Sequence, residues 1–402
     1  MTRRTGLLIF LCSLSAITFL DRLAIAVTAP GIRTDLQLGP DQWGWVLSAY
    51  VLANAIFEIP SGARGDRRGQ RSELTRIVSW WSGFTIATGL CRNFLQMVSA
   101  RFLFGLGTAG AYPNASGVTA KWFPLQEHAR AQGFVWAAGR FGAALAPLLL
   151  VPLERACGWR AVFWLMGAVG LGWAITWWLW FRTEPAYTTQ SAQKATERSG
   201  IPWAQLIASP QLWLIMTAYF CYGWGSWFFF GWFTTWMVRG AGFSVEQMGL
   251  FASFPFIMAM FGNLIGGQLS RSLVLKIGDV AAYRWVTSTC LFAGAALLLA
   301  MSLIRGHIAI VILATLSFGI MDLMLPSAWA MCMKLGGSYG GTATAMMNTA
   351  GNLGGWLCAL VFGYVVKANG NYNLPLQLIA VMVAVAALLF ARVDSSRNPL
   401  LT

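Results

Sequence analysis

The sequence predicts an all-α polytopic membrane protein with twelve transmembrane helices in two pseudo-symmetric bundles of six. Three observations support this fold class: the composition, the number of long apolar runs and the distribution of Lys and Arg. Of 402 residues, 57% are hydrophobic and only 10% are charged, whereas charged residues make up about a quarter of a soluble domain. The 21 Trp and 26 Phe need burial, so the net charge of +14 is not the basic face of a nucleic-acid-binding protein.

Twelve runs are apolar and long enough for the roughly 20 residues that a membrane-crossing helix needs. They lie near 7–31, 43–61, 74–91, 95–118, 129–150, 160–181, 210–237, 247–269, 284–304, 307–332, 341–366 and 373–391. A polar stretch rich in Thr, Ser, Gln and Lys separates the two groups of six. We therefore expect an N-terminal bundle over 1–182, a cytoplasmic linker over 183–209 and a C-terminal bundle over 210–402. No small-residue cleavage pattern follows the first run, which indicates a retained helix rather than a signal peptide.

The distribution of basic residues predicts the orientation in the membrane. With the N-terminus inside, the inner segments hold eighteen Lys and Arg and the outer segments seven. Cytoplasmic loops of membrane proteins carry such an excess. We expect both termini to be cytoplasmic and the protein to lie in the inner (plasma) membrane, with the lipid bilayer as its main partner and no nucleic acid.

The two halves contain an internal repeat. Gly139-x-x-Gly142-x-x-Leu145 reappears as Gly351-x-x-Gly354-x-x-Leu357, 212 residues later, and Phe104-Gly105 reappears as Phe318-Gly319 at an offset of 214. A weaker echo links Gly62 to Gly267. Similar offsets at corresponding spans indicate duplication, as in many transporters. Small residues also let helices approach closely, and ordinary tight packing is an equally good explanation for any single glycine.

The loop after the second run carries a family motif. It reads Gly62-Ala63-Arg64-Gly65-Asp66-Arg67-Arg68-Gly69-Gln70-Arg71, which resembles the signature G-x-L-x-D-R-x-G-x-R of the major facilitator superfamily, with Arg64 in place of the apolar residue. The resemblance implies a gating role for Gly62, Asp66, Arg67, Gly69 and Arg71. In this role the Asp caps a neighbouring helix and pairs with Arg.

Further motifs resemble the anion:cation symporter branch of that superfamily, and two resemble its glucarate transporters. These are Leu20-Asp21-Arg22, Gly44–Tyr50, Arg101-Phe102-x-x-Gly105-x-Gly107, Trp122-Phe123-Pro124, Gly158-Trp159-Arg160, Arg182-x-Glu184-Pro185 and Gly351–Gly355, with Phe57–Pro60 and Tyr112–Ala115 closest to the glucarate transporters. The resemblance implies a monomeric secondary active transporter of small organic anions. It favours sugar acids such as glucarate, galactonate or hexuronate as substrates, moved with protons by alternating access.

Six charged residues fall within the predicted runs, where a charge needs a partner or a function. They are Asp21, Arg22, Glu58, Arg101, Arg140 and Asp322. A guanidinium stays protonated and offers a planar fork of donors to a carboxylate. We expect Arg22 and Arg101, at positions that serve anion recognition in the resembled branch, to bind the substrate. Paired structural ion bridges are the alternative.

Asp21 is the leading candidate for the proton carrier, because burial favours the protonated form of a carboxyl. The resembled branch has Glu where this chain has Thr108, which faces the anion site but cannot carry a proton. The repeat offset of 214 maps Thr108 onto Asp322, and we expect Asp322 to titrate during transport or to balance Arg101. Glu58 is a third candidate for proton coupling, although a structural pair or inner gate with Arg140 is the favoured interpretation.

Several polar residues at helical spacing suit a ligand with many hydroxyl groups. They are Tyr50 and Asn54 in the second run, Tyr222 in the seventh, and Asn348 and Asn352 in the eleventh. Hydrogen bonding between helices is at least as good an explanation for each of them.

The sequence thus favours proton-coupled symport of an organic anion. The alternative is an organic-anion exchanger or a proton-driven exporter of the same fold, which the missing Glu favours. No nucleotide-binding or zinc-protease motif is present, so we expect neither an enzyme nor a cofactor nor a metal site.

Overall fold

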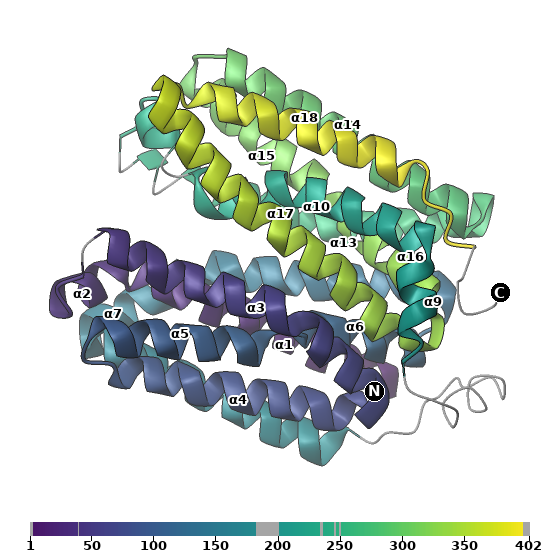
Figure 1. The fold of residues 1–402 in the computed structure, drawn as a ribbon, viewed down its shortest axis with the longest axis horizontal. Coiled ribbons are helices and arrows are strands. Elements are labelled where there is room, and N and C mark those ends of the chain that lie inside the picture. The colour runs from purple at the N-terminus through teal and green to yellow at the C-terminus, as the bar shows by residue number, and fades with distance from the viewer. Residues whose placement is uncertain are drawn as a thin grey trace. The chain divides into compact units, whose positions relative to one another are not determined.

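The computed structural model describes residues 3–38, 40–181, 201–233, 236–244, 247–248 and 251–396. These residues form helices joined by short turns, and no strand occurs among them (Figure 1). Most of the predicted linker, residues 183–200, lies outside the described ranges. The short helix α9 (Trp203–Ala208) occupies the end of that segment.

Two compact units divide the chain by its internal contacts. Unit 1 contains 1–122, 138–201 and 338–345, and unit 2 contains 123–137, 202–337 and 346–402. These units largely follow the two groups of six runs, but each includes a short segment from the other half of the sequence. The predicted domain boundaries at 182 and 209 stay a prediction.

The first half of the chain forms the helices of unit 1 and the start of α7. They are α1 (Arg3–Val27), α2 (Ala29–Asp35), α3 (Pro40–Arg68), α4 (Gln70–Leu90), α5 (Phe94–Thr108), α6 (Ala111–Trp122), η1 (Leu125–Glu127) and α7 (His128–Trp180). The run predicted over 95–118 is broken into α5 and α6 at Gly110, which has φ +82°. The runs over 129–150 and 160–181 both lie in α7, which is interrupted at Gly158 (φ 78°, ψ 162°).

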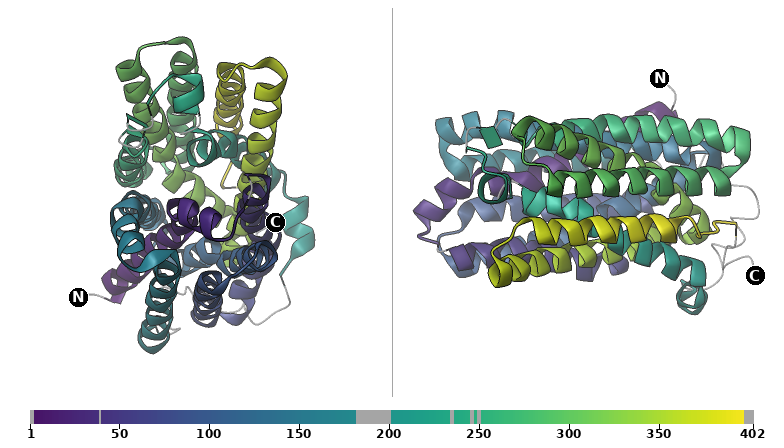
Figure 2. Two further views of the ribbon diagram at one scale, coloured as in Figure 1. Left: turned by 90° about the vertical axis from the view of Figure 1, so that its left-hand side faces the viewer. Right: turned by 90° about the horizontal axis from the view of Figure 1, so that it is seen from above.

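The second half follows the same order of long helices. They are α10 (Pro210–Gly231), η2 (Trp236–Gly240), α13 (Phe254–Ile277), α14 (Asp279–Leu303), α15 (His307–Leu323), α16 (Leu325–Gly336), η3 (Gly337–Tyr339), α17 (Gly340–Asn369) and α18 (Asn373–Phe390). Within unit 2, α15 packs against α13 and α14, and α18 packs against α10 and α14. Figure 2 shows α14 and α18 running along each other over most of their length.

Five helical stretches among the described residues are apolar and long enough to cross a membrane. They are Arg3–Ile25, Pro152–Trp180, Asp279–Leu303, His307–Val366 and Asn373–Phe390. Each of the twelve predicted runs overlaps a described helix, while the number of crossings stays a prediction.

The internal repeat of the sequence recurs as matching helix contacts in the two units. In unit 1 the Gly142 position of α7 faces the backbone oxygen of Ala16 in α1, and in unit 2 the Gly354 position of α17 faces that of Phe220 in α10. A Cβ at these positions would lie 2.4 and 2.1 Å from those oxygens. Because the same helix pairs meet at glycines 212 residues apart, the duplicated motif encodes a duplicated helix crossing.

A second pair of equivalent glycines lies where α5 meets α3 and where α15 meets α13. A Cβ on Gly105 would lie 2.5 Å from the oxygen of Tyr50, and one on Gly319 would lie 2.3 Å from Cγ of Met258. Side chains at these positions would push the paired helices apart. These crossings matter for function because Tyr50 and Asn54 on α3, and Arg101 and Thr108 on α5, are candidate site residues.

We predict that Gly105→Ala lowers the thermal denaturation temperature of the purified protein, because the added methyl overpacks the α3–α5 crossing at a cost of about 1–3 kcal/mol. Gly83→Ala is the matched control: it also lies inside a helix, and a Cβ there meets nothing within 4 Å. Its denaturation temperature should stay the same or rise, since Ala favours helix over Gly. Equal destabilisation by both substitutions would show that overpacking of the α3–α5 crossing is not the cause of the lowered denaturation temperature.

Candidate anion-binding and gating sites

Arg22 and Arg101 converge on one aromatic ring in unit 1. The Cζ of Arg22 on α1 lies 5.5 Å from the ring centroid of Tyr50 on α3, and the Cζ of Arg101 on α5 lies 5.3 Å from it. Phe104, one turn along α5, lies 4.3 Å from the same Arg101 carbon. Cation–π contacts of this kind stabilise a guanidinium without neutralising its charge.

Both guanidinium groups keep donor capacity for a ligand. Arg101 is buried with 1% of its surface exposed, and Arg22 is half-buried. The Nε of each has no hydrogen-bond partner among the described residues. A buried cation with an unused donor is suited to an anionic group, because the charge-assisted hydrogen bond recovers part of the cost of desolvation.

Asp21 lies beside this cationic pair and is 1% exposed. Its charge attracts Arg101, and the indole of Trp81 on α4 also faces it. Within the part of the chain that is described, neither carboxylate oxygen has a hydrogen-bond partner at normal length, nor does Nε1 of Trp81. An ionised carboxylate left in this state is costly, and the role of Asp21 as a proton carrier stays a prediction.

Arg140 on α7 approaches an aromatic ring of α1 that Arg22 also approaches. Its Cζ lies 5.2 Å from the ring of Phe19, which the Cζ of Arg22 approaches to 5.0 Å. The hydroxyl of Tyr112 on α6 is 2.9 Å from that of Ser15 and interacts electrostatically with both arginines. Arg140 therefore belongs with the cationic cluster. Its expected pairing with Glu58, which is 2% exposed on α3, stays a prediction.

Thr108 and Asp322, which the repeat makes equivalent, each accept a hydrogen bond from the amide of an Asn on a neighbouring helix. In unit 1 the amide of Asn54 donates to Oγ1 of Thr108 over 3.1 Å. In unit 2 the amide of Asn263 donates to Oδ2 of Asp322 over 3.2 Å. Asp322 therefore occupies in its own unit the place that Thr108 occupies in the other, with an ionisable group in place of a hydroxyl.

A second donor also contacts Asp322, which is fully buried. The hydroxyl of Tyr222 on α10 donates to Oδ1 over 2.7 Å. Tyr222 thus contacts a candidate proton site. Asn348 and Asn352 lie one turn apart on α17 in unit 2 and are partly buried, and their role in substrate binding stays a prediction.

In the loop motif, Asp66 caps the first turn of α17. Its Oδ2 accepts hydrogen bonds from the backbone nitrogen of Thr342 at 2.7 Å and from the hydroxyl of Thr342 at 2.8 Å. Both residues belong to unit 1. Asp66 lies beyond the run predicted over 43–61, and burial raises its pKa to about 6, although the Thr342 donors and the charge of Lys121 lower it in part.

The other motif residues differ in their surroundings. A Cβ on Gly62 would lie 2.8 Å from the oxygen of Gly341, so this glycine allows a close approach of the two segments. Gly69 has φ +89° between α3 and α4. Arg71 donates to the backbone oxygen of Trp178 and lies 4.3 Å above its ring. Arg67 is exposed, and its gating role stays a prediction.

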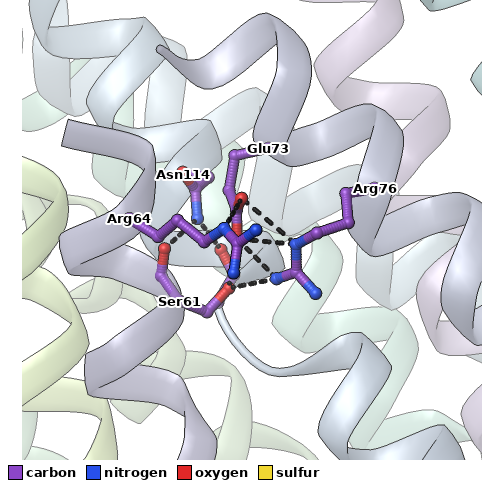
Figure 3. Close-up of polar contacts among 6 residues, drawn as sticks. Ser61, Arg64, Glu73, Arg76 and Asn114 are labelled. Atoms are coloured by element: carbon purple, nitrogen blue, oxygen red, sulfur yellow. Dashed lines mark hydrogen bonds and ion pairs between the residues drawn. The ribbon is translucent and has the colours of Figure 1, made fainter. Parts of the chain in front are cut away.

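An ion cluster around the buried carboxylate of Glu73, which sequence reasoning missed, gives the unusual Arg64 a partner. Glu73 on α4 is 2% exposed, and its carboxylate pairs with Arg64 at 3.3 Å and with Arg76 (Figure 3). The hydroxyl of Ser61 donates to it over 3.1 Å, and the amide of Asn114 donates to the backbone oxygen of Ser61 over 3.2 Å. The spacing of Glu73 and Arg76, one helical turn, was the available signal.

No group of three or more His, Cys, Asp or Glu that could hold a metal ion occurs among the described residues.

Comparison with known proteins identifies the family. The family model of the Major Facilitator Superfamily matches residues 11–359. The chain belongs to the major facilitator superfamily. This membership confirms the predicted all-α fold and makes the protein a transporter rather than an enzyme.

Its relatives include transporters of organic anions. The chain is 31% identical over 406 residues to the probable sulfoacetate transporter SauU of Cupriavidus necator, covering 98% of this chain and 93% of that protein. It is 28% identical over 400 residues to the hexuronate transporter of Bacillus subtilis, covering 96% and 94%. The crystal structure of the human organic anion transporter MFSD10 has the same fold, with a TM-score of 0.76, 15% identity and coverage of 97% and 100%.

We predict that Thr342→Val destabilises the protein more at pH 7.5 than at pH 5. The folded pKa of Asp66, about 6, lies above the value of about 3.9 in an unfolded chain, so its contribution to stability is full below pH 4 and is lost as the pH rises through 6. Above pH 6 the buried carboxylate is charged, and the hydrogen bond from the Thr342 hydroxyl stabilises it by about 1–2 kcal/mol.

Thermal denaturation of the purified protein at both pH values measures this difference. Thr344→Val is the matched control, because the hydroxyl of Thr344 bonds the Gly340 oxygen of its own helix. Its effect should not depend on pH. If Thr342→Val destabilised the protein equally at both pH values, the result would contradict the proposed role of the Thr342 hydroxyl in stabilising the ionised Asp66.

Proposed function

We propose that the protein imports a small organic anion, a sugar acid or a sulfonated acid, together with protons by alternating access. It does so across the inner membrane, with both termini in the cytoplasm. The observation that carries the proposal is the pair of guanidiniums on Tyr50 beside the carboxylate of Asp21. Among the described residues, the Nε of each guanidinium and both oxygens of that carboxylate have no hydrogen-bond partner. Two relatives named for sulfoacetate and hexuronate transport support the substrate class.

In this mechanism the anion binds to Arg22 and Arg101, and Asp21 takes up a proton. Anion binding draws the positive charge of Arg101 away from Asp21. That carboxylate then loses its electrostatic partner and is stabilised by a proton instead. The two ligands therefore bind cooperatively, which is the requirement for symport.

Asp322 offers a second proton site in unit 2. It is fully buried and accepts hydrogen bonds from Tyr222 and Asn263. We propose that it takes the coupling role of the Glu that Thr108 replaces, and that the Asp66 cap and the Glu73 cluster stabilise one state of the transport cycle.

An exchanger or an exporter of organic anions is the second candidate. The observation that favours it is Thr108, which is bonded to Asn54 and cannot titrate in the cationic site. Proteoliposomes separate the two: net uptake driven by an acidic outside supports symport, whereas homoexchange without net uptake supports exchange.

We predict that Arg101→Gln reduces proton-driven uptake of the transported anion at least a hundredfold, because a buried charge-assisted contact of about 3 kcal/mol is lost. The measurement is the initial rate of uptake of a radiolabelled anion into proteoliposomes. Arg92→Gln, an exposed Arg at the α4–α5 turn, is the control and should transport at the wild-type rate. Equal rates for wild type and Arg101→Gln would remove Arg101 from the site.

We predict that Asp322→Asn abolishes net proton-driven uptake but leaves anion exchange, because the amide cannot carry a proton. The rates of both reactions are measured at pH 6 and pH 8. Asp35→Asn is the control: Arg160 and Trp159 hold the pKa of Asp35 below its usual value, so its carboxylate stays ionised across this range. Net uptake with an unchanged pH profile in Asp322→Asn would exclude Asp322 as a coupling residue.

A further inference from the structure

The cationic cluster of unit 1 is an array in which guanidinium groups alternate with aromatic rings. Phe19 lies between Arg140 and Arg22, at 5.2 and 5.0 Å from their Cζ atoms. Tyr50 lies between Arg22 and Arg101, at 5.5 and 5.3 Å. Four helices, α1, α3, α5 and α7, therefore bring three fixed positive charges into one region.

The buried acids in the predicted runs of unit 1 are too few to balance those charges. Asp21 attracts Arg101, whereas Arg22 and Arg101 repel each other. Glu58 on α3 is the other buried acid in the predicted runs of unit 1. With both acids ionised, the three arginines leave a surplus of one positive charge, and with a proton on Asp21 the surplus is two.

The remaining ionisable side chains near the array add no charge at neutral pH. Tyr50 and Tyr112 face it from α3 and α6, and a phenol side chain carries no charge at pH 7. Trp81, which faces Asp21 from α4, does not titrate. The surplus is therefore set by the three arginines and by the state of Asp21 and Glu58.

We infer that the transported anion carries two negative charges and binds while Asp21 holds a proton. This inference rests on the proposed function and narrows its substrate class to a dicarboxylate or a sulfocarboxylate. A dianion neutralises the surplus of two, whereas a monoanion leaves one unpaired charge in a medium of low dielectric constant, where it is costly. Arg101 and Arg140 lie at opposite ends of the array, which suits a ligand with one charged group at each end.

Matched pairs of ligands test the valence directly. Glucarate and gluconate share a carbon chain and differ by a carboxylate in place of an alcohol, and sulfoacetate and isethionate differ in the same way. The dissociation constant of each is measured with the purified protein by titration calorimetry at pH 6. We expect the dianion of at least one pair to bind at least tenfold more tightly than its monoanion. A tenfold difference in dissociation constant corresponds to about 1.4 kcal/mol of binding free energy.

Variants connect the preference to the array. Arg140→Gln should reduce the ratio of the two dissociation constants towards one, while Arg140→Lys, which keeps the charge, should retain it. Asp21→Asn fixes the surplus of positive charge at two. At pH 8 its ratio of monoanion to dianion dissociation constants should be at least as large as that of the wild type at pH 6.

The outcomes separate this inference from the proposed function. Equal or tighter binding of the monoanion in every pair that binds overturns the inference and leaves organic-anion transport intact. An unchanged ratio in Arg140→Gln also overturns it. If neither member of either pair binds or is accumulated by proteoliposomes, the proposed function itself fails.

Discussion

The attraction between Asp21 and Arg101, two groups held almost entirely away from water, is the interaction on which the rest of this site depends. A charge in a membrane-spanning helix is costly unless a partner or a ligand compensates it. Here the compensation is incomplete, because the carboxylate has no hydrogen-bond donor at normal length among the described residues and the guanidinium keeps an unused Nε. A site in this condition is suited to bind an anion and a proton together.

Close packing of the helices brings the charged residues of this site together. The candidate residues come from α1, α3, α5, α6 and α7, and glycines at the crossings let these backbones approach within contact distance. The duplicated half uses the same crossings to hold Asp322 between Asn263 and Tyr222. A duplicated framework thus positions a cationic site in one unit and a buried acid in the other, through contacts that are internal to each unit.

Much of this could be read from the sequence. Apolar runs predicted the helices, similar offsets predicted the repeat, and the equivalence of Thr108 and Asp322 followed from the offset alone. Spacing could not reveal that Arg140 shares Phe19 with Arg22, because that contact joins residues from helices far apart in the chain. Glu73 was missed because a single acid in a basic loop looks solvent-exposed until its burial between Arg64 and Arg76 is known. The break between α5 and α6 at Gly110 was also missed, because hydrophobicity alone does not show that a glycine inside an apolar run has a positive φ.

The proposed mechanism couples anion binding to proton binding at the buried Asp21–Arg101 pair. Proton release or uptake by the purified protein, followed with a pH indicator in weakly buffered solution as a saturating anion is added, tests it most directly. The wild type should take up protons as the anion binds, and Asp21→Asn should bind the anion with less proton uptake. Anion binding by the wild type without any change in bound protons would contradict the coupling.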